Sequence, residues 1–218
     1  MPRLLFEKTD NAVWMSHLDL MRLFQRAFRR AGLHLTHTQG FNPRPSVSIA
    51  LPLSVGVRSM CELLDFELEG EYVSCAQIKE KLNMALVRGV KILDVYENGR
   101  KLKELTLLRC KIYLEYRGSI RTGAPEAIAA LFQKDTLIVP KKSKNGIQQQ
   151  DIIPLIRDLH IMRADDKLII DATVSCQNPS LNPMQIPAAI SLFLPQYSPE
   201  HCAYERLEVL DVQGAAFR

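Results

Sequence analysis

The 218-residue sequence predicts an α+β fold made of two ferredoxin-like units in tandem, with helices packed on antiparallel sheets. Three observations support this prediction. The apolar pattern changes between strand and helix periods, the resulting order β-α-β-β-α-β occurs twice, and each occurrence spans about 100 residues, which is an ordinary domain size. We place the units at residues 1–98 and 105–218, because the segment 97–105 carries Asn98-Gly99 and alternating charge, which are typical of a linker.

The first unit begins with a short apolar strand, predicted for residues 4–8, and an amphipathic helix. Ser16 suits a helix N-cap, with Asp19 three residues later as an imperfect capping box, and Gly32 ends the helix predicted for 17–31. Alternating patterns and turn residues then predict a strand, a second strand, a helix and a closing strand, at 46–51, 61–68, 74–86 and 90–96.

The second unit repeats this order with a different sequence. We predict strands at 107–116, 137–140, 167–176 and 204–212, and helices at 124–133 and 183–192. The strand at 137–140 runs into a basic turn at 141–146. The segment 151–162 fits either a short helix or an added strand, because the spacing of its apolar residues suits both periods.

Composition excludes several classes of protein. Hydrophobic residues make up 47% and charged residues 24%, the balance of a soluble globular protein. The longest strongly apolar stretches reach only about ten residues, against roughly 20 for a membrane helix, so no membrane association is expected. Five cysteines without a C-x-x-C pair, in a chain without a signal peptide, indicate reduced thiols and a cytoplasmic location.

Motifs for cofactor and metal chemistry do not occur in the sequence. It contains no P-loop, dinucleotide, zinc-protease or hydrolase-elbow motif, so we expect no cofactor in this chain. On a strand, His34 and His37 would point to opposite faces, which is poor geometry for a metal, so no metal site is expected. His17, at the start of the first helix, is expected to be a capping or packed histidine, with a general acid–base role as the alternative.

Positive charge is concentrated in one part of the chain. The formal net charge is +4, but residues 20–61 alone carry six arginines and no acidic residue, and the segments on either side sum to −1 each. On the first helix, Arg22, Arg26 and Arg29 fall on one stripe opposite the apolar face. Because the planar fork of arginine suits phosphates and base edges, this stripe indicates a polyanion such as nucleic acid. A solvated basic helix face is the alternative.

Turn residues surround an aromatic residue and an arginine in the segment Gln39-Gly-Phe-Asn-Pro-Arg-Pro45. Gly40 permits a positive φ, Asn42 favours a turn, and the two prolines keep the residues before them out of helical conformations. We expect a stiff loop that presents Phe41 and Arg44. The alternative is a connector in which Phe41 fills the core.

Three segments together resemble a bacterial protein family: Ser16-His-Leu-Asp-Leu-Met-Arg22, Gln39-Gly-Phe-Asn-Pro-Arg-Pro45 and Leu51-Pro-Leu-Ser-Val-Gly56. The sequence is similar to the radical-SAM-linked protein family, a domain of unknown function found alone or fused to the C-terminus of radical SAM proteins. The resemblance implies a radical SAM partner, and the family's frequent location near ribonuclease G and ribosomal protein genes favours an RNA setting. Since this chain has no C-x-x-x-C-x-x-C, radical chemistry would take place in a separate protein. A weaker similarity of architecture links the chain to the CRISPR repeat-processing endoribonucleases.

Together these observations lead us to expect an RNA-binding accessory module, without catalytic residues, that presents tRNA or rRNA to a radical SAM modification enzyme acting in trans. The residues expected to contact the RNA are Arg22, Arg26, Arg29, Arg30, Phe41, Asn42 and Arg44. One alternative is a metal-independent endoribonuclease in which His17 acts as general acid–base group. The other is a protein-interaction module whose arginine stripe docks on an acidic patch of the radical SAM partner.

Overall fold

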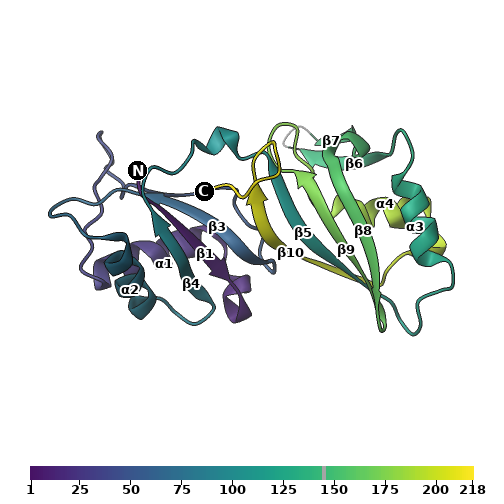
Figure 1. Ribbon diagram of the computed structural model, residues 1–218, viewed down its shortest axis with the longest axis horizontal. Helices are drawn as coiled ribbons and strands as arrows, with labels where there is room; N and C mark the ends of the chain where they lie inside the picture. The colour runs from purple at the N-terminus through teal and green to yellow at the C-terminus, as the bar shows by residue number, and fades with distance from the viewer. Residues whose placement is uncertain (144–145) are drawn as a thin grey trace. The chain divides into compact units, whose positions relative to one another are not determined.

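The computed structural model of the protein describes residues 1–143 and 146–218, and Figure 1 shows its helices and strands. Within those residues it is a mixed α+β protein with four α-helices. The chain forms two compact units, one made of Met1–Leu102 together with Arg218 and the other of Lys103–Phe217. The division therefore falls inside the segment 97–105 that carries the linker pattern.

The first unit is an antiparallel sheet with two helices. Its elements are β1 (Arg3–Lys8), α1 (His17–Arg30), β2 (Val47–Ile49), β3 (Arg58–Phe66), α2 (Cys75–Ala85) and β4 (Val90–Tyr96). β1 pairs with both β4 and β3, and β2 pairs with β3, so the strand order in this unit is β4-β1-β3-β2. Every one of these pairs is antiparallel, and the order of elements along the chain is the predicted one.

Both helices of the first unit pack on one face of its sheet. Leu4 and Phe6 of β1 are fully buried in a hydrophobic cluster that also contains the apolar residues of α1 and α2. Phe24 of α1 meets Phe6 edge-on with ring centroids 4.8 Å apart, and Phe28 lies 5.0 Å from Phe66 of β3. Two aromatic contacts thus fix the rotation of α1 about its axis, and with it the direction of the helix's polar face.

The second unit contains four antiparallel strands, two helices and a separate hairpin. Its elements are β5 (Leu107–Glu115), α3 (Ala124–Phe132), β6 (Ile138–Ser143), β7 (Gly146–Asp151), β8 (Ile156–Ala164), β9 (Lys167–Ser175), α4 (Gln185–Phe193) and β10 (His201–Leu210). β5 pairs with β10 and β9, and β8 pairs with β9, which gives the order β10-β5-β9-β8. β6 and β7 pair with each other to form a two-stranded sheet.

The prediction that residues 137–140 supply the second strand of the β-α-β-β-α-β unit is wrong. That segment begins the hairpin β6–β7, and the ambiguous segment 151–162 supplies most of β8, the strand that pairs with β9. The reason is that every residue of β8 is half-buried or exposed and none is fully buried, as suits an edge strand, so its apolar signal is weak. Of the predicted basic turn 141–146, residues 141–143 belong to β6 and Gly146 begins β7, so the turn prediction is wrong there, and residues 144–145 lie outside the described residues.

α4 forms despite the proline within it. Pro187 is the third residue of the helix, where the backbone N–H would have no partner inside the helix, so the missing donor costs nothing. Among residues 1–143 and 146–218, no helix is both long and apolar enough to cross a membrane.

Candidate functional site

α1 begins at a well-formed cap. The Ser16 hydroxyl accepts a hydrogen bond from the backbone N–H of Asp19 (3.2 Å) and donates one to the carboxylate of the same residue (2.6 Å). The hydrogen bond from the Ser16 hydroxyl to the carboxylate lowers the pKa of Asp19, and the nearby Arg22 adds to the effect. Ser16 is therefore the cap of α1, as predicted; of the two roles expected for His17 the capping one does not hold, while its half-buried side chain fits the packed one.

The arginine stripe of α1 faces solvent. The helix buries Leu20, Phe24, Ala27 and Phe28. Arg22, Arg26 and Arg29 lie on its other side and are all exposed. The face that the sequence predicts to be basic is therefore an open surface of the first unit.

The four arginines of α1 differ in what they contact. Arg22 pairs with Asp19 at 3.6 Å, and Arg30 donates from Nη2 to the carbonyl of Ala85 at 2.5 Å, at the C-terminal end of α2. Such carbonyls have no partner within their own helix, so Arg30 acts as a cap that ties α1 to α2. Arg26 and Arg29 make no ion pair or side-chain hydrogen bond with any residue in the described part of the chain.

The segment after α1 forms a small hairpin with a free tip. The backbone N–H of Thr38 donates to the carbonyl of Arg44 (2.8 Å), the N–H of Arg44 donates to the Thr38 hydroxyl (3.0 Å), and His37 and Pro45 form an isolated β-bridge. Residues 39–43 are all exposed. Phe41 is 101% exposed, so the alternative in which it fills the core is wrong.

The base of this hairpin is fixed to the sheet. The N–H of Ser46 donates to the carbonyl of Thr36 (2.7 Å), and the N–H of Glu67 donates to the carbonyl of Ser46 (3.1 Å). Leu35 forms a β-bridge with Leu68, just beyond the end of β3. The tip, with Phe41, the exposed Asn42 and Arg44, is thus held on a rigid support. The guanidinium of Arg44, like those of Arg26 and Arg29, has no partner among the described residues.

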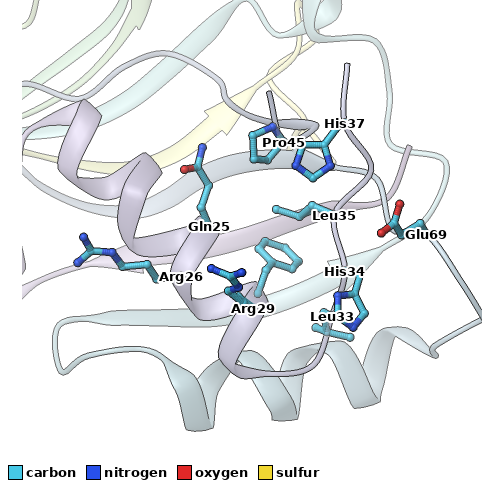
Figure 2. Close-up of a pocket in the computed structure, with 10 residues that line it drawn as sticks. Gln25, Arg26, Arg29, Leu33, His34, Leu35, His37, Pro45 and Glu69 are labelled. Carbon is cyan, nitrogen blue, oxygen red and sulfur yellow. The ribbon is translucent and has the colours of Figure 1, made fainter. Parts of the chain in front are cut away.

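A pocket of about 440 Å³ lies between α1 and the base of the hairpin, and Figure 2 shows its lining residues. Its apolar lining comes from buried or half-buried side chains, namely Phe28, Leu33, Leu35 and Pro45. Its polar lining comes from side chains of both signs, namely Gln25, Arg26, Arg29, His34, His37 and Glu69. In Figure 2 Gln25, Arg26 and Arg29 project from α1, and both histidines belong to the segment that follows it.

The predicted orientation of His34 and His37 is wrong, because both line this one pocket. Residues 33–38 do not form a continuous strand; they make isolated bridges through Leu35 and His37 only, so the strict alternation of a strand does not apply. In the chain outside residues 144–145, no group of three or more His, Cys, Asp or Glu side chains is placed to hold a metal ion.

His17 lies apart from this arrangement. It is the first residue of α1, is half-buried, and is not among the residues that line the pocket. Within the described residues its imidazole has no hydrogen-bond or ion-pair partner that would orient it as a general acid–base group.

Three cysteines of the second unit carry strongly shifted thiols. Burial raises the pKa of Cys110 and Cys176 to about 12 and that of Cys202 to about 11. Because the nucleophilic form of cysteine is the thiolate, these thiols are poor nucleophiles at neutral pH.

The sequence indicates the exposed arginines but not the pocket beside them. Gln25 shares a helix face with Arg29 at the i, i+4 spacing, which is a signal available in the sequence. Glu69 comes to the pocket from the far end of β3, because its backbone N–H donates to the carbonyl of His34 (2.9 Å). No local pattern indicates that long-range contact.

Comparison with solved structures shows a likeness of fold. The crystal structure of a Cbf5–Nop10–Gar1 complex contains a chain that aligns with a TM-score of 0.54 and 6% sequence identity, covering 95% of this chain and 48% of that one. This chain therefore spans about half the length of its structural neighbour. An unknown protein from Galdieria sulphuraria aligns over 94% of this chain and 96% of its own, at 12% identity and a TM-score of only 0.27.

Comparison with sequences places the chain in a family. A search of the curated proteins finds no match. The family model described as "Uncharacterized protein conserved in bacteria (DUF2344)" matches residues 2–183, and the chain therefore belongs to that family.

Proposed function

We propose that this protein is an RNA-binding module that presents a tRNA or rRNA substrate to a radical SAM modification enzyme acting in trans. The observation that carries the proposal is the pair of exposed guanidinium groups, Arg26 and Arg29, which have no partner within the described residues and stand beside a pocket. The hairpin that closes the same pocket carries a third such group, Arg44, and the fully exposed Phe41.

The chemistry of these groups suits single-stranded RNA. A solvated guanidinium without an internal partner breaks no bond within the protein when it contacts a phosphate. By contrast, Arg22 would have to break its ion pair with Asp19, and Arg30 its hydrogen bond to the carbonyl of Ala85. An aromatic ring on a stiff tip offers a stacking surface for an unpaired base at low entropic cost. We therefore assign the phosphate contacts first to Arg26, Arg29 and Arg44 and the stacking contact to Phe41.

The partner enzyme follows from the resemblance to the radical-SAM-linked family. The sequence lacks the C-x-x-x-C-x-x-C motif, so the iron–sulfur cluster would belong to the partner, and this chain would supply RNA recognition. Two tandem ferredoxin-like units are part of the same proposal. They are supported by the equivalent strand orders β4-β1-β3-β2 and β10-β5-β9-β8, with the hairpin β6–β7 inserted in the second unit.

The test is recovery of RNA crosslinked to the protein in cells. We compare the wild type with Arg26→Glu/Arg29→Glu and with a control of equal charge change, Arg88→Glu/Arg117→Glu. The control arginines are 92% and 89% exposed at the side chain and each already pairs with a carboxylate. Enrichment of a defined tRNA or rRNA segment by the wild type and the control, and its loss in the first variant, is the expected result.

Two outcomes would contradict the proposal. Equal recovery of RNA by all three proteins would mean that Arg26 and Arg29 do not bind it. No enrichment at all, combined with a radical SAM partner that is retained after ribonuclease treatment and lost in Arg26→Glu/Arg29→Glu, would favour the protein-interaction alternative. Cleavage of RNA in EDTA that disappears in His17→Ala would favour the nuclease alternative.

A further inference from the structure

The pocket beside the arginines has the size and lining of a site for a flat, partly apolar ligand. Its volume of about 440 Å³ lies within the range of roughly 300–1,000 Å³ that is typical of small-molecule sites. Phe28, Leu33 and Leu35 are almost completely buried side chains whose edges form its apolar lining. A simple phosphate site needs no such surface, whereas a nucleobase does.

The charges at the pocket are of both signs. Arg26 and Arg29 lie on the α1 side, and Glu69 lies on the other side of the segment that carries the two histidines, as Figure 2 shows. Glu69 is exposed, and its carboxylate has no ion-pair or hydrogen-bond partner in the described part of the chain. Since a carboxylate only accepts hydrogen bonds, its partner in a ligand must be an N–H or O–H donor.

We propose that this pocket binds one unpaired guanine base of the RNA, with Glu69 accepting from the base and with Arg26 and Arg29 binding the two phosphates that flank this nucleotide. Guanine carries two adjacent donors, N1–H and the 2-amino group, which match the two oxygens of a carboxylate. Uracil presents a single N–H between two carbonyl oxygens, which a carboxylate repels. The two histidines offer flat rings at the same pocket against which a base can stack. This inference rests on the proposed function and adds a base preference to it.

The experiment measures binding of four small probes to the full chain by calorimetry: 5′-GMP, 5′-IMP, 5′-UMP and ribose 5-phosphate. IMP differs from GMP only by the missing 2-amino group. We expect GMP to bind about 10- to 150-fold more tightly than IMP, because IMP keeps the N1–H bond but loses the bond from the 2-amino group to the carboxylate, and we expect UMP to bind no better than ribose 5-phosphate.

Two glutamate variants, one inside and one outside the pocket lining, test whether the preference for GMP depends on Glu69. Glu69→Gln should reduce the preference for GMP over IMP to less than about twofold while leaving the affinity for ribose 5-phosphate unchanged. Glu71→Gln, at a position that is also exposed but lies outside the pocket lining, is the matched control and should keep the wild-type preference. Equal affinity for GMP, IMP and UMP in the wild type, absence of GMP binding, or an unchanged preference in Glu69→Gln overturns the inference.

A parallel titration with labelled pentauridine distinguishes this failure from failure of the proposed function. Pentauridine contains no guanine, so its binding reports only the phosphate contacts and the stacking on Phe41. Loss of the GMP preference with pentauridine binding intact would overturn the base assignment and leave the RNA-binding function standing. Absence of pentauridine binding with GMP preference intact would overturn the RNA-binding function and leave a nucleotide pocket.

Discussion

Replacing Arg26, Arg29 and Arg44 by alanine should sharply reduce the salt dependence of RNA binding. These three residues carry the guanidinium groups of the interface that have no partner within the described residues, so each is available for a phosphate. Arg22 and Arg30 already hold Asp19 and the Ala85 carbonyl. The proposed interface therefore has three main phosphate contacts at this surface.

The magnitude follows from counterion release. Each phosphate contact to a single strand contributes about 0.7 to the slope of log affinity against log salt, so three contacts contribute about 2.1. When salt rises fourfold, from about 50 to 200 mM, the wild type should lose about 18-fold more affinity than the triple variant.

The assay is fluorescence anisotropy of a labelled single-stranded RNA across that salt range. Arg88→Ala/Arg117→Ala is the control, since both arginines are exposed but paired with carboxylates, and its slope should match the wild type. Arg30→Ala should also keep the wild-type slope, because its guanidinium caps α2. A triple variant whose slope equals that of the wild type would refute the assignment of these contacts.

The remaining predictions concern the hairpin tip and the stability of the first unit. Phe41→Ala should leave the thermal midpoint unchanged, because the ring is fully exposed, but should weaken binding of single-stranded RNA by about 1–3 kcal/mol; an unchanged affinity in anisotropy titrations would exclude stacking. Gly89→Ala should destabilise the protein by about 2 kcal/mol or more in urea unfolding, because φ there is +90° and the new Cβ would lie 2.5 Å from the carbonyl oxygen of Thr9. Ser16→Ala should cost about 1 kcal/mol by removing the cap of α1. The pKa of Asp19 in the folded state lies below its ordinary value of 3.8, so the bond from Ser16 to the ionised carboxylate stabilises the fold above that pH and is lost as pH falls through the lower, folded-state pKa. The difference in unfolding free energy between the wild type and Ser16→Ala should therefore shrink in acid. A difference that does not change with pH would contradict the coupling of Ser16 to Asp19.

The first unit follows closely from its sequence because its signals are local. Ser16, the apolar stripe and Gly32 set the bounds of α1 to within about one residue. The exposed face of α1 then follows from helical geometry alone. The same reasoning places Arg22, Arg26 and Arg29 on the surface, where the structure has them.

What the sequence does not predict depends on long-range contacts. The role of Arg30 is decided by the position of Ala85, which lies 55 residues later. The pocket is decided by Glu69 and His34, which meet through a backbone hydrogen bond beyond the end of β3. In the second unit, β8 is an edge strand with a weak apolar pattern, so its pairing with β9 cannot be distinguished from a short helix by periodicity.

In the hairpin closed between Thr38 and Arg44, the residues that hold the fold are different from the residues that face solvent at the tip. The bonds that hold the hairpin use backbone groups and one hydroxyl, while the tip, residues 39–43, is entirely exposed. Doubling the length of such a tip raises the entropic cost of closing it by only about 0.6 kcal/mol. The tip can therefore lengthen or change its composition without altering the fold of the unit, and under the proposed function it is the natural place for related proteins to acquire different RNA preferences.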